Sequence, residues 1–199
     1  FFDDENVYIS ARCWDSHPER IVANEMRRDH RNIYQNAHFA VVLDTFYDRR
    51  NGFFFQTNPL GALREQSISD EGASNNNDWN TVWDVQTARF DQGWTIEMAI
   101  PFKSLRYGTE AGQYWGINFQ RRVAWKNETS FLTPIPAALR ELGGFKVSSA
   151  ATLVDLEVPT SAARFEVKPY AIADLTTNLG ATPRVLNQPG GTAGFDVKY

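Results

Sequence analysis

The chain has 199 residues, of which 42% are hydrophobic and 22% charged, a composition typical of one globular domain with a short additional segment and not of a disordered region. Its net charge of −4 at pH 7 provides no basic surface for nucleic acid, and no apolar run approaches the ~20 residues of a membrane helix. A single cysteine excludes an internal disulfide, and three scattered histidines do not favour a histidine-rich zinc site.

Strand patterns dominate the first half of the chain. Residues 7–14 alternate between apolar and polar side chains, which indicates a strand with one buried face. Residues 39–47 form a dense apolar run, and the turn signal Asn51-Gly52 comes directly before residues 53–57, so these segments predict a hairpin. Another strand is expected in residues 62–69.

The second half continues in the same way. Residues 70–78 are polar and rich in asparagine, so we expect a loop, and residues 134–142 predict one short helix closed by Gly143-Gly144. Four further segments have strand patterns: residues 79–90, 94–100, 115–123 and 145–156. Roughly eight to ten short strands without alternating helices predict an all-β fold, an antiparallel β-sandwich.

A domain boundary is expected near residue 158. Residues 158–163 have the composition of a linker, which separates a sandwich over residues 1–158 from a tail over residues 159–199. Phe1-Phe2 has the pattern of a strand end and the chain stops inside another strand pattern, so we expect the N-terminal strand of the sandwich, a signal peptide and further C-terminal strands to lie outside it.

A series of sequence blocks carries a family resemblance. The blocks are residues 8–12, 21–29, 42–46, 48–52, 55–59, 78–85, 99–106 and 115–122. In this order they resemble bacterial proteins in which a carbohydrate-binding family 9-like sandwich is followed by an outer-membrane β-barrel. The resemblance covers residues 1–158 and, more weakly, the tail.

This resemblance implies a non-catalytic module of a cell-envelope protein of a Gram-negative-type bacterium. Its partners would be a carbohydrate ligand and a C-terminal β-barrel of the same chain, which would provide the contact with the membrane. Residues 167–170 and 194–199 would be the first barrel strands. The family pattern has acidic residues where this chain has residues 35–38 (Gln-Asn-Ala-His), so a metal site that uses those carboxylates is not expected.

Aromatic and amide side chains are the candidates for carbohydrate contact. Trp79 and Trp83 lie four residues apart, so in a strand they would share one face and could stack on a sugar ring. The alternative is that one or both fill the core. Asn58, Arg64, Asn118 and Arg122 could hydrogen-bond sugar hydroxyls, the last two from one strand face that also holds Gln120; the alternative is a solvated face with charge pairing.

Other chemistry has weaker support in the sequence. Asp70, Glu71 and Asp78 offer oxygen ligands for a structural calcium ion, although their spacing differs from an EF-hand loop and a plain flexible loop is the alternative. No other cofactor is expected. Glycoside hydrolysis would need two facing carboxylates, for which Asp44, Asp84 and Glu97 are the candidates. Cys13 has the setting of a buried hydrophobic residue and not of a nucleophile.

Two rival functions therefore remain open besides carbohydrate binding. In the first, the sandwich is an interaction or plug domain that gates or braces the barrel. In the second, it is a domain associated with glycoside hydrolysis in carbohydrate catabolism.

Overall fold

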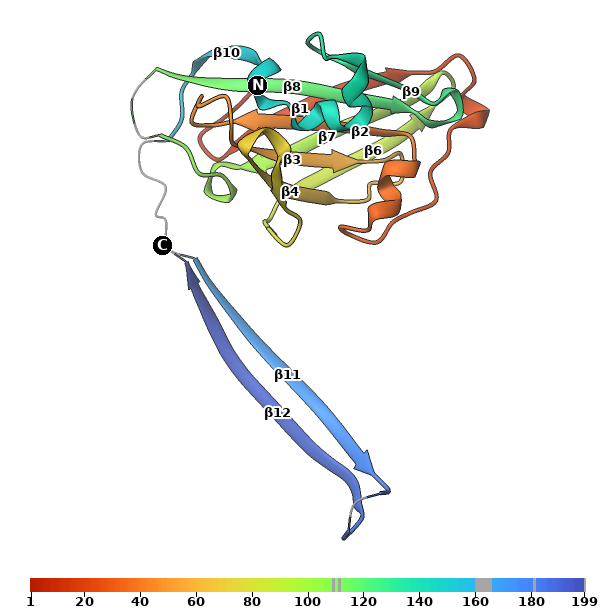
Figure 1. The fold of residues 1–199 in the computed structure, drawn as a ribbon, viewed down its shortest axis with the longest axis vertical. Coiled ribbons are helices and arrows are strands. Elements are labelled where there is room, and N and C mark those ends of the chain that lie inside the picture. The colour runs from red at the N-terminus through yellow and green to blue at the C-terminus, as the bar shows by residue number, and fades with distance from the viewer. Residues whose placement is uncertain (109, 111, 160–165, 181, 199) are drawn as a thin grey trace. The chain divides into compact units, whose positions relative to one another are not determined.

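The computed structural model describes the chain except residues 109, 111, 160–165, 181 and 199. It divides into two compact units, Phe1–Ser161 and Ala162–Tyr199. Figure 1 shows the strand labels used below.

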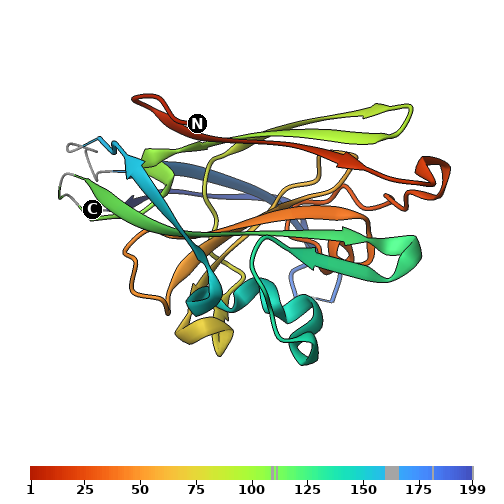
Figure 2. The same ribbon diagram turned by 90° about the horizontal axis from the view of Figure 1, so that it is seen from above.

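The first unit consists of two antiparallel sheets. The smaller sheet has the order β1-β7-β6, and its strands are β1 (Asn6–Trp14), β6 (Asp84–Phe90) and β7 (Gly93–Pro101). The larger sheet has the order β10-β8-β2-β3-β4-β5, with β9 beside β8. Its strands are β2 (His38–Asp44), β3 (Gly52–Thr57), β4 (Arg64–Ser69), β5 (Ser74–Asn76), β8 (Gln113–Val123), β9 (Glu128–Phe131) and β10 (Ala151–Leu156). The two sheets form the layers seen in Figure 2, so the predicted all-β antiparallel sandwich is confirmed.

Period-two alternation builds the core between the sheets. In the smaller sheet, Val7, Ile9 and Cys13 of β1 are buried opposite Ile100, Met98 and Trp94 of β7. In the larger sheet, Phe55 contacts Trp83 with ring centroids 5.3 Å apart, and Trp115 contacts Phe102 at 6.2 Å. Burial of these aromatic and aliphatic side chains is the main stabilising contribution.

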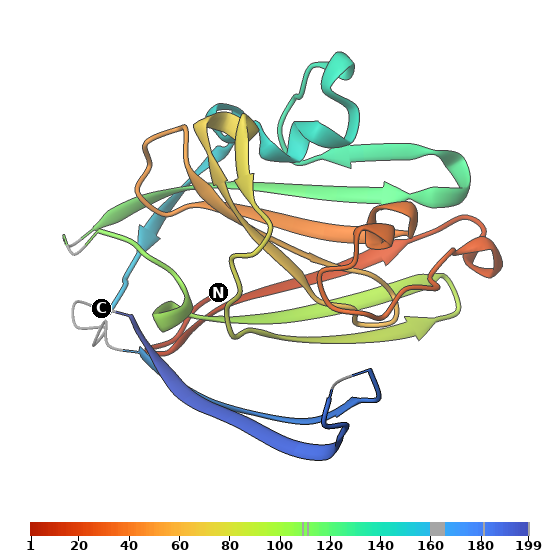
Figure 3. The same cartoon turned by 60° about the horizontal axis from the view of Figure 1, so that its bottom comes forward.

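The opposite face of the larger sheet is also covered, which explains why every residue of β2 is buried. Ala40, Val42, Phe54 and Ile68 pack there against Phe145 and Val147. The last two come from the 3-10 helices η6 (Ala137–Phe145) and η7 (Val147–Ser149). Figures 2 and 3 show these short helices on the side of the larger sheet that faces away from the smaller one. We call this side the outer face of the larger sheet.

Short 3-10 helices make most of the remaining connections. They are η1 (Pro18–Arg20), η2 (Arg31–Gln35), η3 (Asp70–Gly72), η4 (Phe102–Ser104) and η5 (Ala124–Lys126). The predicted loop over residues 70–78 instead contains η3 and the edge strand β5, because β5 pairs with Ile68 and its neighbours in β4. The strand expected over residues 79–90 begins only at Asp84.

The second unit is a β-hairpin. Strand β11 (Glu166–Asn178) pairs with β12 (Val185–Lys198) in an antiparallel register that places Tyr170 opposite Gly194. Strand β12 runs through Pro189 and three glycines, which a two-stranded ribbon tolerates because both strands are edges. Within the described residues, no helix has the length and apolar character needed to cross a bilayer.

Candidate functional site

The two tryptophans predicted to form a sugar platform do not share an exposed face. Trp83 is 2% exposed, its ring packs on Phe55, and its Nε1 donates a hydrogen bond of 3.0 Å to the buried Glu65 carboxylate. Trp79 is half-buried against Phe53 and Phe55. The prediction of an exposed tryptophan platform is thus wrong, because the strand that was expected to hold both indoles starts after Trp83.

Asn58, predicted to contact sugar hydroxyls, is buried, and its amide group is fully used by the backbone around it and by the Asn36 side chain. Its Nδ2 donates to the Glu25 carbonyl at 2.7 Å and to Asn36 Oδ1 at 3.0 Å. Its Oδ1 accepts from the backbone amides of Leu60 and Ala62. No donor or acceptor is left for a ligand, so this prediction is wrong.

Asn118 and Arg122 lie on one sheet face as expected, and Arg64 lies on the same face, but Arg64 and Asn118 are covered. Arg64 is 7% exposed and contacts Gln56, Gln66 and Asn77, with the Tyr34 ring 4.0 Å from its guanidinium carbon. Asn118 is 3% exposed and holds Thr133 through both its amide atoms. Arg122 alone borders an open pocket.

The acidic residues predicted to bind calcium do not form one site, and two of them form ion pairs with different cationic side chains. Asp70 pairs with Arg50 at 2.6 Å, whereas Glu71 contacts Lys146 and accepts from Ser148 Oγ at 2.8 Å. The Lys146 ammonium lowers the pKa of the Glu71 carboxyl. Asp78 is exposed, and the described part of the chain holds no group of three metal-ligating side chains.

Of the carboxylates considered for hydrolysis, Asp44 lies in the larger sheet, whereas Asp84 and Glu97 lie on the paired strands β6 and β7 of the smaller sheet. Asp44 is buried at the end of β2 and accepts the backbone amides of Asp48 and Arg49, so it stabilises the β2–β3 turn. Asp84 and Glu97 are exposed on the smaller sheet. Cys13 is 2% exposed and burial raises its thiol pKa to about 11, which agrees with a core residue.

Unpartnered polar atoms gather on the outer face of the larger sheet. Among the described residues, six buried side-chain atoms lack a hydrogen-bond partner: Nε2 of His38, Gln56 and Gln66, Oδ1 of Asn75, Oε1 of Gln120 and Nε of Arg122. The register places His38 opposite Arg122, and it places Ala40 opposite both Gln56 and Gln120. Buried polar groups in proteins are rarely left unpaired, so the concentration of such atoms on one face marks this face as a candidate functional surface.

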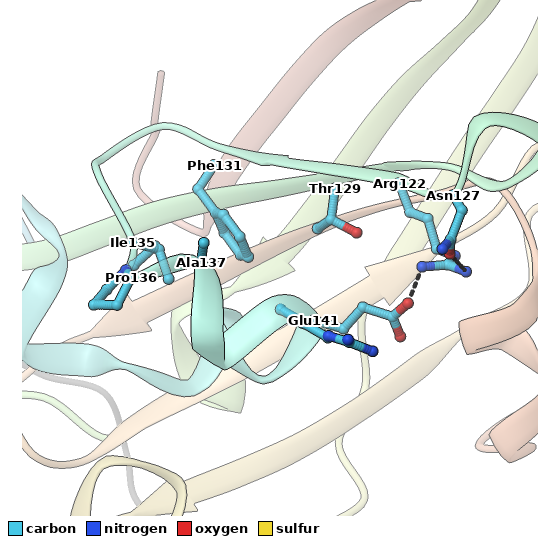
Figure 4. A pocket seen from close by; sticks show the side chains of 9 residues that line it. Arg122, Asn127, Thr129, Phe131, Ile135, Pro136, Ala137 and Glu141 are labelled. Carbon is cyan, nitrogen blue, oxygen red and sulfur yellow. Dashed lines mark hydrogen bonds and ion pairs between the residues drawn. The ribbon is translucent and has the colours of Figure 1, made fainter.

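A pocket of about 520 Å³ opens at one edge of this face, between β8, β9 and η6. Figure 4 shows Phe131, Ile135, Pro136 and Ala137 at its apolar end, and Arg122 and Asn127 at its polar end. Thr129, Arg140 and Glu141 complete the lining. A volume of this size and a lining that is part apolar and part hydrogen-bonding are typical of small-molecule sites.

Arg122 is the central polar group of the pocket. Its side chain is only 10% exposed, it forms an ion pair with Glu141, and it donates to Asn127 Oδ1 at 3.1 Å. Its Nε has no partner, and burial lowers the guanidinium pKa. The guanidinium is therefore partly desolvated, and its covered Nε lacks a hydrogen-bond partner.

Two contacts fix the segment that walls the pocket. Asn118 binds Thr133 at its beginning, and Gln120 Nε2 donates to the Glu141 carbonyl at 3.3 Å near its end. Of the pocket lining, the sequence had indicated only Arg122. Most of the remaining residues lie in β9 and in the segment predicted as a short helix. Pro134, Pro136 and Gly143 were the sequence feature that could have indicated an irregular segment there.

A second, shallower hollow of about 480 Å³ lies between Trp14, Asp15 and Asp91. Trp14 is 52% exposed, and Trp125 nearby donates from Nε1 to Asp15 at 3.1 Å. The exposed indole of this protein is thus at Trp14 and not at Trp83.

No family model and no curated protein matches the chain. Solved structures do. A carbohydrate-binding module of family 9 from Caldicellulosiruptor kristjanssonii in complex with cellotriose is 14% identical with a TM-score of 0.49, covering 81% of this chain and 73% of that one. The glucose complex of such a module from the same organism is 15% identical with a TM-score of 0.48, covering 81% and 75%. A putative carbohydrate-binding protein from Bacteroides uniformis is 14% identical with a TM-score of 0.44, covering 56% of each chain. Likenesses at this level assign neither a ligand nor a site to this chain.

Proposed function

We propose that this protein binds carbohydrate, and that the saccharide occupies the pocket beside Arg122. The observation that carries this proposal is the division of one 520 Å³ pocket into an apolar wall and a hydrogen-bonding wall. A sugar ring has the same division, with apolar C–H faces and hydroxyl groups around its edge.

The apolar wall suits the face of a pyranose ring. Phe131 provides an aromatic ring, and Ile135 and Pro136 provide aliphatic surface next to it. Sugar C–H groups pack on such surfaces, and the fixed aromatic side chain loses little conformational entropy on binding.

The polar wall offers both donors and acceptors. The lining contains the guanidinium groups of Arg122 and Arg140, the Asn127 amide and the Thr129 hydroxyl, so it provides donors and acceptors together. A hydroxyl group accepts and donates at once, so it matches this mixture better than a purely apolar ligand does.

The place of the protein in the cell is part of the same proposal. We place it in the cell envelope of a Gram-negative-type bacterium, with the β11–β12 hairpin as the beginning of a strand-rich membrane unit. The hairpin supports this with exposed apolar side chains: Tyr170, Ile172, Leu175, Leu186 and Phe195. Cell fractionation of the native host with an antibody to the protein tests this part, and recovery in the cytosol would refute it.

Calorimetric titration of the full chain with oligosaccharides tests the binding proposal. The panel contains glucose, cellotriose and acidic and neutral oligosaccharides of other linkages. We expect saturable binding of at least one of these oligosaccharides. Phe131→Ala should lower the affinity for it about tenfold, which corresponds to about 1.4 kcal/mol. The matched control is Trp14→Ala, which removes an exposed aromatic ring elsewhere and should leave affinity unchanged. Binding that survives in Phe131→Ala but fails in Trp14→Ala would overturn the assignment to this pocket.

A further inference from the structure

We infer that the saccharide is acidic, with a carboxylate that binds between Arg122 and Arg140. This inference rests on the proposed function, because it names the class of sugar for the same pocket. A uronic acid residue, whose carboxylate replaces the exocyclic hydroxymethyl group of a hexose, is the ligand chemistry meant.

The charges around the pocket do not balance. Its lining contains two guanidinium groups, Arg122 and Arg140, and one carboxylate, Glu141. Glu141 is engaged by Arg122, whereas no ion pair of the described residues involves Arg140. The pocket therefore carries an excess positive charge that a ligand carboxylate would neutralise.

The same sheet face carries a further guanidinium on β4, which β2 and β3 separate from β8. Arg64 is buried among amide side chains and the Tyr34 ring, and no described carboxylate pairs with it. His38 is neutral near pH 7, since burial lowers its pKa to about 3. Beside Arg122 the one carboxylate of the pocket lining is Glu141, so the local charge favours an anion over a neutral sugar.

Partial burial strengthens the attraction of the Arg122 guanidinium for an anion. Nine-tenths of its side chain is removed from solvent, yet its Nε hydrogen is unpartnered. A guanidinium that is shielded from water gains more from a carboxylate than an exposed one does, and its planar fork suits the two carboxylate oxygens. Nη1 contacts Glu141 and Nη2 contacts Asn127, while Nε is covered, so a ligand carboxylate would accept from the remaining Nη hydrogens.

The backbone at Arg140 is an independent indication. Arg140 has φ 47° and ψ −129°, a conformation that a residue with a Cβ rarely adopts. Such strain costs free energy and persists where the surrounding structure holds it, often at ligand sites. Here it presents an unpaired cation to the pocket.

The test compares one sugar with and without its charge. Trigalacturonic acid and its fully methyl-esterified form are titrated into the full chain by calorimetry at pH 7, in low and high salt. The acid is expected to bind at least about tenfold more tightly at low salt, and the difference should shrink as salt screens the charges. A sulfated galactose trisaccharide is the third ligand, and tighter binding of the sulfate ester would overturn the carboxylate assignment.

Two variants locate the effect. Arg140→Gln should weaken binding of the acid about tenfold and change binding of the ester less than about twofold, whereas Arg89→Gln, which removes an exposed arginine of the smaller sheet, should change neither. Glu141→Gln removes the competing carboxylate, so it should strengthen binding of the acid alone. Weaker acid binding in Glu141→Gln, or unchanged acid binding in Arg140→Gln, would contradict the inference.

The outcomes separate the two proposals. Equal affinities for the acid and the ester would overturn the acidic-sugar inference and leave carbohydrate binding standing. Absence of binding to these ligands and to every neutral saccharide of the panel would overturn the proposed function itself. Circular dichroism of each variant establishes that a loss of binding is not a loss of fold.

Discussion

His38 shows how one residue couples the outer face of the larger sheet to pH. The imidazole is fully buried and lies opposite the Arg122 guanidinium, so protonation would place a second cation in a site without a carboxylate partner for it. Burial is the main reason that its pKa falls from 6.5 to about 3.

The depressed pKa predicts a pH dependence of stability. Between about pH 6.5 and pH 3 the unfolded state binds a proton at this histidine and the folded state does not, so the free energy of unfolding falls as pH falls through this window. The loss of stability is absent above pH 6.5 and amounts to several kcal/mol by about pH 3. In His38→Gln, the urea-unfolding free energy should therefore depend less on pH than in the wild type.

His17→Gln is the matched control, since the His17 side chain is 53% exposed. Its profile should follow the wild type across the window. A His38→Gln profile that coincides with both would show that His38 is not the titrating group.

Trp83 and Trp79 provide a second residue-level prediction. Trp83→Phe keeps an aromatic ring in the core but removes the donor to Glu65, a buried carboxylate that also accepts from Arg28 and from the Thr81 amide. Loss of a hydrogen bond to a buried charge costs about 1–3 kcal/mol. Trp79→Phe, which has no such donor contact in the structure, should cost less in chemical denaturation. Equal losses would mean that ring volume, and not the hydrogen bond, matters at both positions.

Residue patterns in the sequence predicted which side chains share a face but not which of them are covered. The alternation in residues 118–122 correctly placed Asn118, Gln120 and Arg122 side by side. Their burial follows from η6, which comes later in the chain and packs back over the sheet, and a local pattern contains no such information. For the same reason Trp83 could be either core or platform until the start of β6 was known.

At the level of elements, the register between β1 and β7 depends on one close backbone approach. Gly93 lies opposite Trp14, has φ 152°, and a Cβ there would collide with the Cys13 carbonyl group. Strands were predictable here because the alternation is regular on both sides of the Asp91–Gly93 turn. The steric need for glycine at position 93 could not be predicted, because it arises from the neighbouring strand β1.

Gly93→Ala should therefore destabilise the smaller sheet by more than about 2 kcal/mol, because it combines an unfavourable φ with a clash against β1. Gly112→Ala is the matched control: it also has a positive φ, 69°, but nothing lies within 4 Å of its Cβ position. The difference between the two free energies of unfolding isolates the clash. A difference near zero would contradict the approach of β1 to Gly93.

At the level of the whole molecule, the two units differ in how they can be stable. The first unit has buried aromatic and aliphatic residues on both faces of its larger sheet, whereas the second consists of two strands whose large apolar side chains are exposed. A two-stranded hairpin without a packed face is at best marginally stable in water. Every residue that lines the pocket beside Arg122 belongs to the first unit.

A chain cut after Ser161 should for these reasons keep both the fold and the binding of the first unit. We expect its urea midpoint to match that of the full chain within error, and its affinity for a saccharide ligand of the full chain to change by less than about twofold. The measurement is tryptophan fluorescence in urea, which reports on this unit because the tryptophans lie at residues 14–125. A broad, non-cooperative transition or a lost affinity would show that residues 162–199 complete the core or the pocket, and it would favour a protein in which the sandwich works only as part of a larger assembly.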